Sequence, residues 1–204
     1  MQITIKEKTI QKLASDGKAN EGTERVDLKQ VSITFPKIPQ DLAEFRSIDR
    51  KGDNGRFVTM ALLICAYKNW KPDNEELCAE MMKELMNSPI AGNSYSNFTR
   101  SFVKERMMQN NKWKFIADAY FDGAAPNNGY TPSVPLTITL REYPYLPQTS
   151  TYYGKELKVD RIVSDFKGAD SERSIQVYED PTDGKWYIWS DSFGSLLADI
   201  KTSS

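Results

Sequence analysis

The chain has 204 residues, 39% of them apolar and 27% charged, with a formal net charge of −1 and no histidine. This length suits a single domain that a hydrophobic core alone can hold together. Without imidazole there is no Ser-His-Asp or Cys-His catalysis and no His-ligated metal, so any chemistry would use Asp, Glu, Lys, Tyr or Cys.

Residues 1–30 combine charged residues, glycines and asparagines with few apolar positions. This composition predicts a loosely ordered N-terminal arm, within which residues 3–13 would add a strand or a short helix. Val31, Ile33 and Phe35 then alternate with polar residues, as in a half-buried strand. We expect a single domain from residue 31 to residue 204.

The next part of the chain, about residues 41–121, predicts the helices. The most apolar of these helices has apolar residues almost all round, which is typical of a helix enclosed by the core. Asp53 or Asn54 would cap it, and Asp73 would cap the following helix. The predicted helices span residues 41–48, 56–69, about 73–88 and 96–109, and the first part of 113–121 is also assigned to helix.

The pattern changes at residues 123–135, where prolines and the Asn128-Gly129 dipeptide predict a loop. Alternating apolar residues then predict four strands, the last two joined by a tight turn at 180–184. Helices followed by strands indicate an α+β fold, with an N-terminal layer of about three to four helices packed on a C-terminal four-stranded antiparallel sheet. The predicted strands lie within about 134–190, at 134–140, 157–163, 175–177 and 185–190.

Location and partners follow from composition. Cys65 and Cys78 lie in apolar segments, which predicts free thiols that pack in the core. Residues 1–17 lack the apolar stretch of a secretory signal, and the apolar run 57–67 is about half of the ~20 residues that cross a bilayer. We therefore expect a cytoplasmic protein with no membrane contact. Its 27 basic and 28 acidic residues argue against a nucleic-acid partner.

Four stretches form a specific combination of motifs: ALLICAY with the Met/Leu-rich helix after it, YFDGAAPNNGYTPSVPLTITL, GADSERSIQV and KWYIWSDSFGSLLADIK. With them, the chain from Phe57 onward resembles a family of uncharacterised bacterial proteins, a domain of unknown function. The corresponding family forms are close to GATPENNYTP, GADSPRP and W-x-LWE. The resemblance implies a shared fold, and it brings no activity or cofactor with it.

The chain departs from these forms at charged positions. It has residues 127–130 as Asn-Asn-Gly-Tyr where the family form reads Glu-Asn-Asn-Tyr, and Ser190-Asp191 where the family form has Glu. It reads Ala-Asp-Ile-Lys at 198–201 in place of Gly-Ile-Arg. Because these acidic and basic groups are not kept, a catalytic role for them loses support.

The loop 123–135 is the first candidate site. Its amides Asn127 and Asn128 and its phenol Tyr130, together with Tyr120 just before the loop, would bind a polar ligand or a peptide. The alternative is an ordered connection in which the asparagines satisfy the turn backbone and Tyr130 caps the core.

The second candidate is the stretch 168–171 followed by Arg173, where backbone N–H groups and the guanidinium would hold an anion. The alternative is a strand connection in which Asp170 makes a turn hydrogen bond and Arg173 pairs locally. Neither a phosphate-binding glycine motif nor a carboxylate pattern for a metal is present, so we predict no cofactor and no metal.

The third candidate is an aromatic face. Alternation along 185–190 places Trp186 and Ile188 on one side of the strand and Tyr187 and Trp189 on the other. The Tyr187/Trp189 side would face a partner, or would be covered by the N-terminal arm or a helix.

Three functional hypotheses remain from the sequence. The leading one is a non-catalytic intracellular module that binds a small-molecule or protein partner, with no residue assigned a catalytic role. The alternative is a small His-independent enzyme of a cone-like α+β type, with a pocket that uses Asp, Tyr or Lys. The third is a homodimer built on the Tyr187/Trp189 face.

Overall fold

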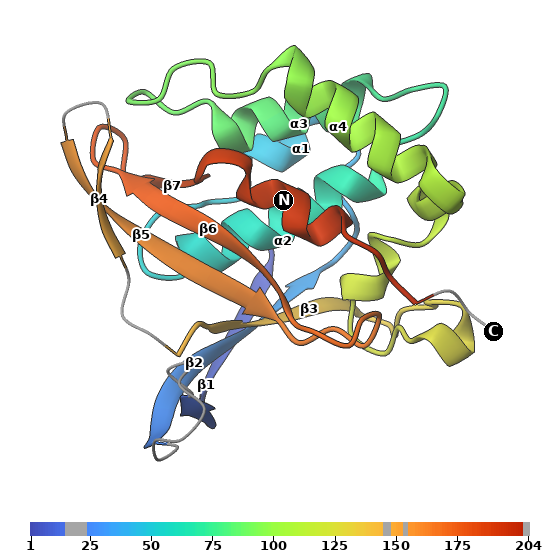
Figure 1. The fold of residues 1–204 in the computed structure, drawn as a ribbon, viewed down its shortest axis with the longest axis horizontal. Helices are drawn as coiled ribbons and strands as arrows, with labels where there is room; N and C mark the ends of the chain where they lie inside the picture. The colour runs from blue at the N-terminus through green and yellow to red at the C-terminus, as the bar shows by residue number, and fades with distance from the viewer. Residues whose placement is uncertain (15–23, 145–147, 153–154, 202–204) are drawn as a thin grey trace.

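The computed structural model describes residues 1–14, 24–144, 148–152 and 155–201. The described residues form four α-helices, four short 3-10 helices and seven strands (Figure 1). The strands are β1 (Thr4–Ala14), β2 (Glu24–Phe35), β3 (Leu136–Glu142), β4 (Gln148–Tyr152), β5 (Lys155–Ser164), β6 (Arg173–Asp180) and β7 (Lys185–Ile188). The α-helices are α1 (Leu42–Arg46), α2 (Gly55–Lys68), α3 (Glu76–Met86) and α4 (Asn97–Met108), and the 3-10 helices are η1 (Gln109–Lys114), η2 (Asp118–Tyr120), η3 (Pro126–Asn128) and η4 (Ser190–Leu197).

All seven strands belong to one antiparallel sheet. Six follow the order β1-β2-β3-β5-β6-β7, and β4 pairs with β5. The predicted layout, with helices first and a four-stranded sheet after them, is therefore wrong, because strands lie at both ends of the chain and the helices come between them. In Figure 1, β3 lies between β1 and β2 on one side and β5, β6 and β7 on the other, and β1 and β2 extend away from those later strands.

The arm predicted over residues 1–30 contributes to this sheet. β1 pairs with β2 along its whole length, with Ile5 opposite Ile33 and Glu7 opposite Val31, while residues 15–23 lie outside the described residues. A strand, one of the two expectations for residues 3–13, is confirmed as β1. The composition suggested a loose arm because β1 carries polar side chains such as Lys6 and Lys8, which are typical of an edge strand. Backbone pairing does not require an apolar side chain at every second position.

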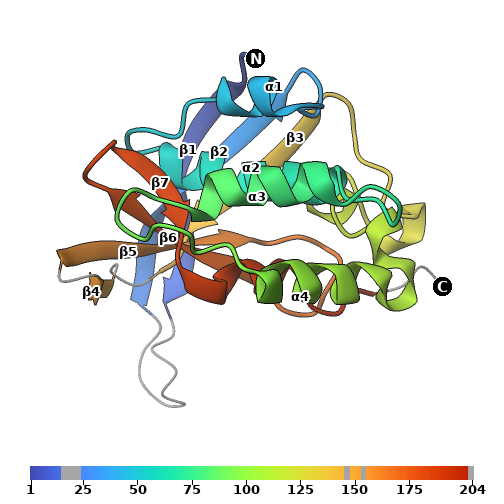
Figure 2. The same cartoon turned by 90° about the horizontal axis from the view of Figure 1, so that it is seen from above.

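The helix α2 forms the centre of the molecule. Every residue from Gly55 to Tyr67 is buried. The helix α3 packs against α2, and strands from two parts of the sheet, β2 and β3 in one part and β5, β6 and β7 in the other, also contact it (Figure 2). This confirms the prediction of a helix enclosed by the core. Cys65 and Cys78 are free and buried, and burial raises the pKa of both thiols. None of the described helices is long and apolar enough to span a bilayer.

The start of α4 agrees with the prediction from the sequence, and the start of α3 differs from it. The predicted start of α4 is confirmed, since the Ser96 hydroxyl accepts a hydrogen bond from the Thr99 N–H at 3.3 Å in a capping box. The predicted cap of α3 by Asp73 is wrong, because the helix begins at Glu76. Residues 71–74 instead close a separate turn, in which the Asn74 N–H donates to the Lys71 carbonyl at 3.2 Å.

The two halves of the sheet meet where β3 pairs with β5. In the described residues the ladder between these strands is short: Arg141 pairs with Val163 and Glu142 with Ile162, and the Tyr143 N–H donates to the Arg161 carbonyl at 3.2 Å. Because successive side chains on a strand point to opposite faces, Glu142 points to the inner face, toward α2, and Arg141 to the outer face. We call this narrow junction the sheet corner.

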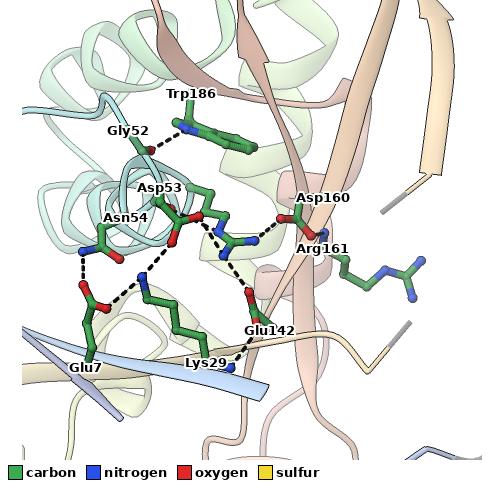
Figure 3. A network of polar contacts seen from close by, with 10 residues as sticks. Glu7, Lys29, Gly52, Asp53, Asn54, Glu142, Asp160, Arg161 and Trp186 are labelled. Carbon is green, nitrogen blue, oxygen red and sulfur yellow. Dashed lines mark hydrogen bonds and ion pairs between the residues drawn. The ribbon is translucent and has the colours of Figure 1, made fainter. Parts of the chain in front are cut away.

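One guanidinium holds the inner side of the sheet corner. Arg56, in the first turn of α2, pairs with Glu142 at 2.6 Å and with Asp160 of β5, so it joins both halves of the sheet (Figure 3). The side chains of Arg56 and Asp160 are 9% and 7% exposed. Burial opposes the charge on Arg56, but the hydrogen bond and charge of Asp160 outweigh it and hold the pKa of Arg56 above its usual value.

A second cation extends this network to the edge of the sheet. The Lys29 ammonium lies between Glu7 of β1 and Asp53, at 2.9 and 2.7 Å (Figure 3). The Lys29 backbone N–H also donates to Glu142 at 2.7 Å. The turn before α2 is thereby tied to β1, β2 and β3 together.

Replacing Arg56 with Met should destabilise the protein by about 3 kcal/mol, because Glu142 and the buried Asp160 lose their shared cation. The measurement is urea unfolding followed by circular dichroism. The matched control is Arg46→Met, which removes an exposed pair with Glu84 and should cost less than about 1 kcal/mol. Equal losses in the two variants would show that the corner does not depend on Arg56.

The cap of α4 gives a smaller test. Ser96→Ala should lower the free energy of unfolding by about 1 kcal/mol, since the hydroxyl that accepts from Thr99 is removed. Ser101→Ala, an exposed substitution inside the same helix, is the control. Thermal unfolding should show a drop of about 2–4 °C for Ser96→Ala, and a similar drop in the control would assign the effect to the helix in general.

Candidate functional site

A small hollow lies at the outer side of the sheet corner. Beyond the pair Arg141–Val163 the strands β3 and β5 separate, and the segment 119–124 crosses the gap between them. This space, which is partly open to solvent, has a volume of about 210 Å³, and we call it the corner hollow. Polar residues that line it are Gln30, Asp122, Thr139, Arg141, Ser164, Asp165 and Lys167.

The backbone of β3 has a gap in its hydrogen bonding along this hollow. The Thr137 carbonyl accepts from the Asp122 N–H at 2.8 Å, Arg141 pairs with Val163, and the Tyr143 N–H donates to the Arg161 carbonyl at 3.2 Å. Because every second residue of a strand points its N–H and C=O to the same edge, Thr139 points to this edge too. Within the described residues, its backbone groups have no partner on that edge.

The wall formed by Arg141 is fixed by ion pairs. Its Nε and Nη2 atoms donate to both carboxylate oxygens of Asp165, at 2.6 and 2.8 Å, and Nη2 also pairs with Glu172. Partial burial would raise the pKa of Asp165, but the hydrogen bonds and charge of Arg141 prevail and hold that pKa below its usual value. Glu172 precedes β6, so Arg141 connects β3 to β5 and β6 on the outer face.

Other polar groups beside the hollow are uncommitted. The side chains of Gln30, Ser164 and Lys167 line it, and in the described part of the chain none of them has a hydrogen-bond or ion-pair partner. Ser164 is only 2% exposed. Among the described side chains only Asn54 Oδ1 is a buried polar atom without a partner, so the Ser164 hydroxyl remains accessible to water or a ligand, and the hollow is suited to a polar occupant.

Tyr120 is the one residue predicted from the sequence that lines the hollow. Its ring stacks on Phe166 with centroids 4.5 Å apart, and its hydroxyl donates to the Leu196 carbonyl at 2.8 Å. Burial raises the pKa of this phenol. Tyr120 therefore supplies an apolar wall, while its hydroxyl is used to hold η4.

The asparagines of the 123–135 loop lie at its turn. The Asn128 side chain accepts from the Ala125 and Thr131 N–H groups at 2.9 and 3.1 Å and donates to the Gly123 carbonyl at 2.8 Å. Asn127 is exposed beside it. For Asn128 the geometry matches the interpretation that asparagine satisfies the turn backbone.

Tyr130, Asp170 and Arg173 gather around the C-terminal segment 198–201. The Tyr130 hydroxyl donates to the Lys201 carbonyl, and Asp170 pairs with the Lys201 ammonium through a side chain that is 90% exposed. Arg173 donates to the Ser171 hydroxyl and to the Asp199 carbonyl, both at 2.8 Å. These contacts hold the C-terminal segment against the loops, and they use the Arg173 groups that an anion would need.

Tyr187 and Trp189 lie in a separate cluster on the outer face, with Leu157 and Tyr178. Tyr187 is 4% exposed, and its hydroxyl donates to Asp183 at 2.7 Å. Ile90 packs on the cluster. The predicted alternation is confirmed, since Trp186 and Ile188 belong to the main core, and on the opposite side Ile90, in the segment after α3, covers part of the cluster.

A broader groove of about 450 Å³ lies on the inner face beside the Arg56 network. Its charged lining residues are Asp53, Glu156, Lys158 and Glu179. Asp53 is already paired with Lys29 and Arg56, so the groove offers exposed charges and no unpartnered buried group. The described residues contain no group of three Cys, Asp or Glu side chains placed to hold a metal ion.

Sequence reasoning missed most of the corner hollow. Thr139 belongs to the strand predicted at 134–140 and Arg141 directly follows it, but no residue type in the sequence marks where the pairing of β3 with β5 ends. Ser164 and Asp165 stand at the end of another predicted strand. The available signal was Arg141-Glu142, two adjacent charged residues directly after an apolar strand. Because adjacent side chains point to opposite faces, this pair indicates an ion-pair partner on each face of the sheet.

Comparisons with known proteins give a family and no activity. No curated protein and no solved structure matches the chain. Residues 37–204 match the family described as domain of unknown function DUF6935, in agreement with the resemblance seen in the motifs. The chain belongs to this family of domains of unknown function.

Proposed function

We propose that the protein is a non-catalytic binding module that takes a small polar ligand into the corner hollow. The observation that carries this proposal is the interrupted hydrogen bonding of β3 at Thr139, in a hollow that Ser164, whose hydroxyl has no partner among the described residues, also lines. Backbone and hydroxyl groups in such positions are satisfied by water or by a ligand. A ligand that offers both donors and acceptors would fit them.

The size and rigidity of the site limit the ligand. At about 210 Å³ the hollow is smaller than the ~300–1,000 Å³ typical of drug-sized ligands. Its walls are strand ends joined by Arg141 to Asp165 and Glu172, so little rearrangement is needed for binding. A pre-formed wall lowers the entropic cost of holding a small molecule.

The enzymatic alternative has less support from the carboxyl groups. A general acid in a cone-like pocket would need a carboxyl with a raised pKa. Every described Asp or Glu with a perturbed pKa is shifted downward, as for Asp165 beside the hollow. Asp170 is exposed and pairs with Lys201 outside the hollow.

A partner-binding face at Tyr187 and Trp189 also has less support, because Tyr187 is buried and its hydroxyl is already bonded. We propose a cytoplasmic setting in a bacterial cell, in keeping with the two free buried thiols and with the family resemblance.

Binding can be tested with a library of amino acids, dipeptides, small amides and organic acids, monitored by the NMR amide signals of Ala124, Thr139 and Ser164. We expect at least one class to shift these signals saturably. Gln30→Trp should weaken that binding at least tenfold, because an indole at this partly exposed position fills the hollow.

The matched control is Lys8→Trp, since Lys8 lies opposite Gln30 on the neighbouring strand and does not line the hollow. It should leave affinity unchanged. If no compound moves the three signals, or if Gln30→Trp binds as well as the wild type, the corner hollow is not a binding site.

A further inference from the structure

We propose that the corner hollow recognises a peptide unit, and that its ligand is a free dipeptide or a similar small zwitterion whose amide completes the β3 edge at Thr139. This inference rests on the proposed function and specifies its ligand.

The spacing of partners along β3 defines what is missing. The Thr137 carbonyl accepts from the Asp122 N–H, Arg141 pairs with Val163, and the Tyr143 N–H donates to the Arg161 carbonyl. Between them, Thr139 has neither its N–H nor its C=O paired on this edge within the described residues. An extended residue presents one N–H and one C=O to the strand edge. A ligand amide lying along the edge supplies the complementary acceptor and donor, as in the addition of a strand to a sheet.

The charges around the hollow suit a molecule with one charge of each sign. Its charged lining residues are Asp122, Arg141, Asp165 and Lys167, two acidic and two basic. Arg141 and Asp165 are paired with each other. This leaves the Asp122 carboxylate, which accepts only the Thr139 hydroxyl at 2.8 Å among the described residues, for an ammonium group, and the uncommitted Lys167 ammonium for a carboxylate.

Volume limits the length of the peptide. About 210 Å³ corresponds to roughly seven water molecules at ~30 Å³ each, which is room for a dipeptide with small side chains. Ala124 and the ring of Phe166 line the same space, and they offer apolar contact to a short side chain without a deep pocket for a large one.

The test compares glycylglycine with 5-aminopentanoate, a zwitterion of the same chain length in which two methylenes replace the amide. Binding to the full chain is measured by NMR titration, and hydrogen exchange of the Thr139 amide is measured with each compound at saturation. We expect glycylglycine to bind at least tenfold more tightly and to slow exchange at Thr139, while 5-aminopentanoate leaves that exchange unchanged.

A charge variant tests the second half of the inference. Lys167→Ala should weaken both compounds several-fold, because each has a carboxylate, while Lys71→Ala, at an exposed lysine outside the hollow, should leave both unchanged. If the Lys167→Ala variant binds both compounds as tightly as the wild type, Lys167 does not bind the ligand carboxylate.

Equal affinity for the two compounds, or fast exchange at Thr139 in the glycylglycine complex, would overturn the peptide assignment. If glycylglycine does not bind while other library members shift the Ala124, Thr139 and Ser164 signals, the peptide assignment fails and the proposed function stands. If no compound shifts them, both fail.

Discussion

The fold depends on how two half-sheets are held together across the short ladder that the described parts of β3 and β5 form. Arg56 bridges Glu142 and Asp160 on the inner face, and Arg141 bridges Asp165 and Glu172 on the outer face. Residues 141 and 142 are adjacent and therefore point to opposite faces, so two neighbouring residues provide an ion pair on each face of the sheet. Backbone hydrogen bonds alone would leave this junction narrow, and the guanidinium groups, with their several donors in fixed geometry, extend it.

The same constraint explains why α2 is enclosed and why a hollow exists. A flat sheet cannot surround a helix, so the strands must diverge somewhere for both halves to pack on α2. They diverge at β3 and β5, and the segment 119–124 fills the opening incompletely. The corner hollow is thus a consequence of the curvature that buries the core, and the groups that line it are strand ends and ion pairs needed for the fold.

The sequence predicted those elements whose burial is periodic. α2, α4 and the alternation of Trp186 and Ile188 on one side of β7 were predictable because side-chain pattern and burial coincide. β1 was predicted only as a strand or a short helix over residues 3–13, since an edge strand is specified by backbone pairing with β2 and carries Lys and Glu where a central strand would be apolar. The corner hollow was out of reach for a related reason: it is defined by where pairing stops, and residues 139 and 164 look the same whether paired or unpaired.

The candidate residues taken from loops proved to be those that hold the loops in place. Asn128 closes its own turn, and Tyr130 and Arg173 secure the C-terminal segment. Polar side chains in turns commonly form hydrogen bonds with nearby backbone groups that need partners. A polar loop residue is therefore evidence for a ligand only when its donors and acceptors remain free. By that criterion Ser164, Gln30 and the backbone of Thr139 qualify, although none of them lies in a loop, and the groups that are free to bind a ligand therefore lie on the strands.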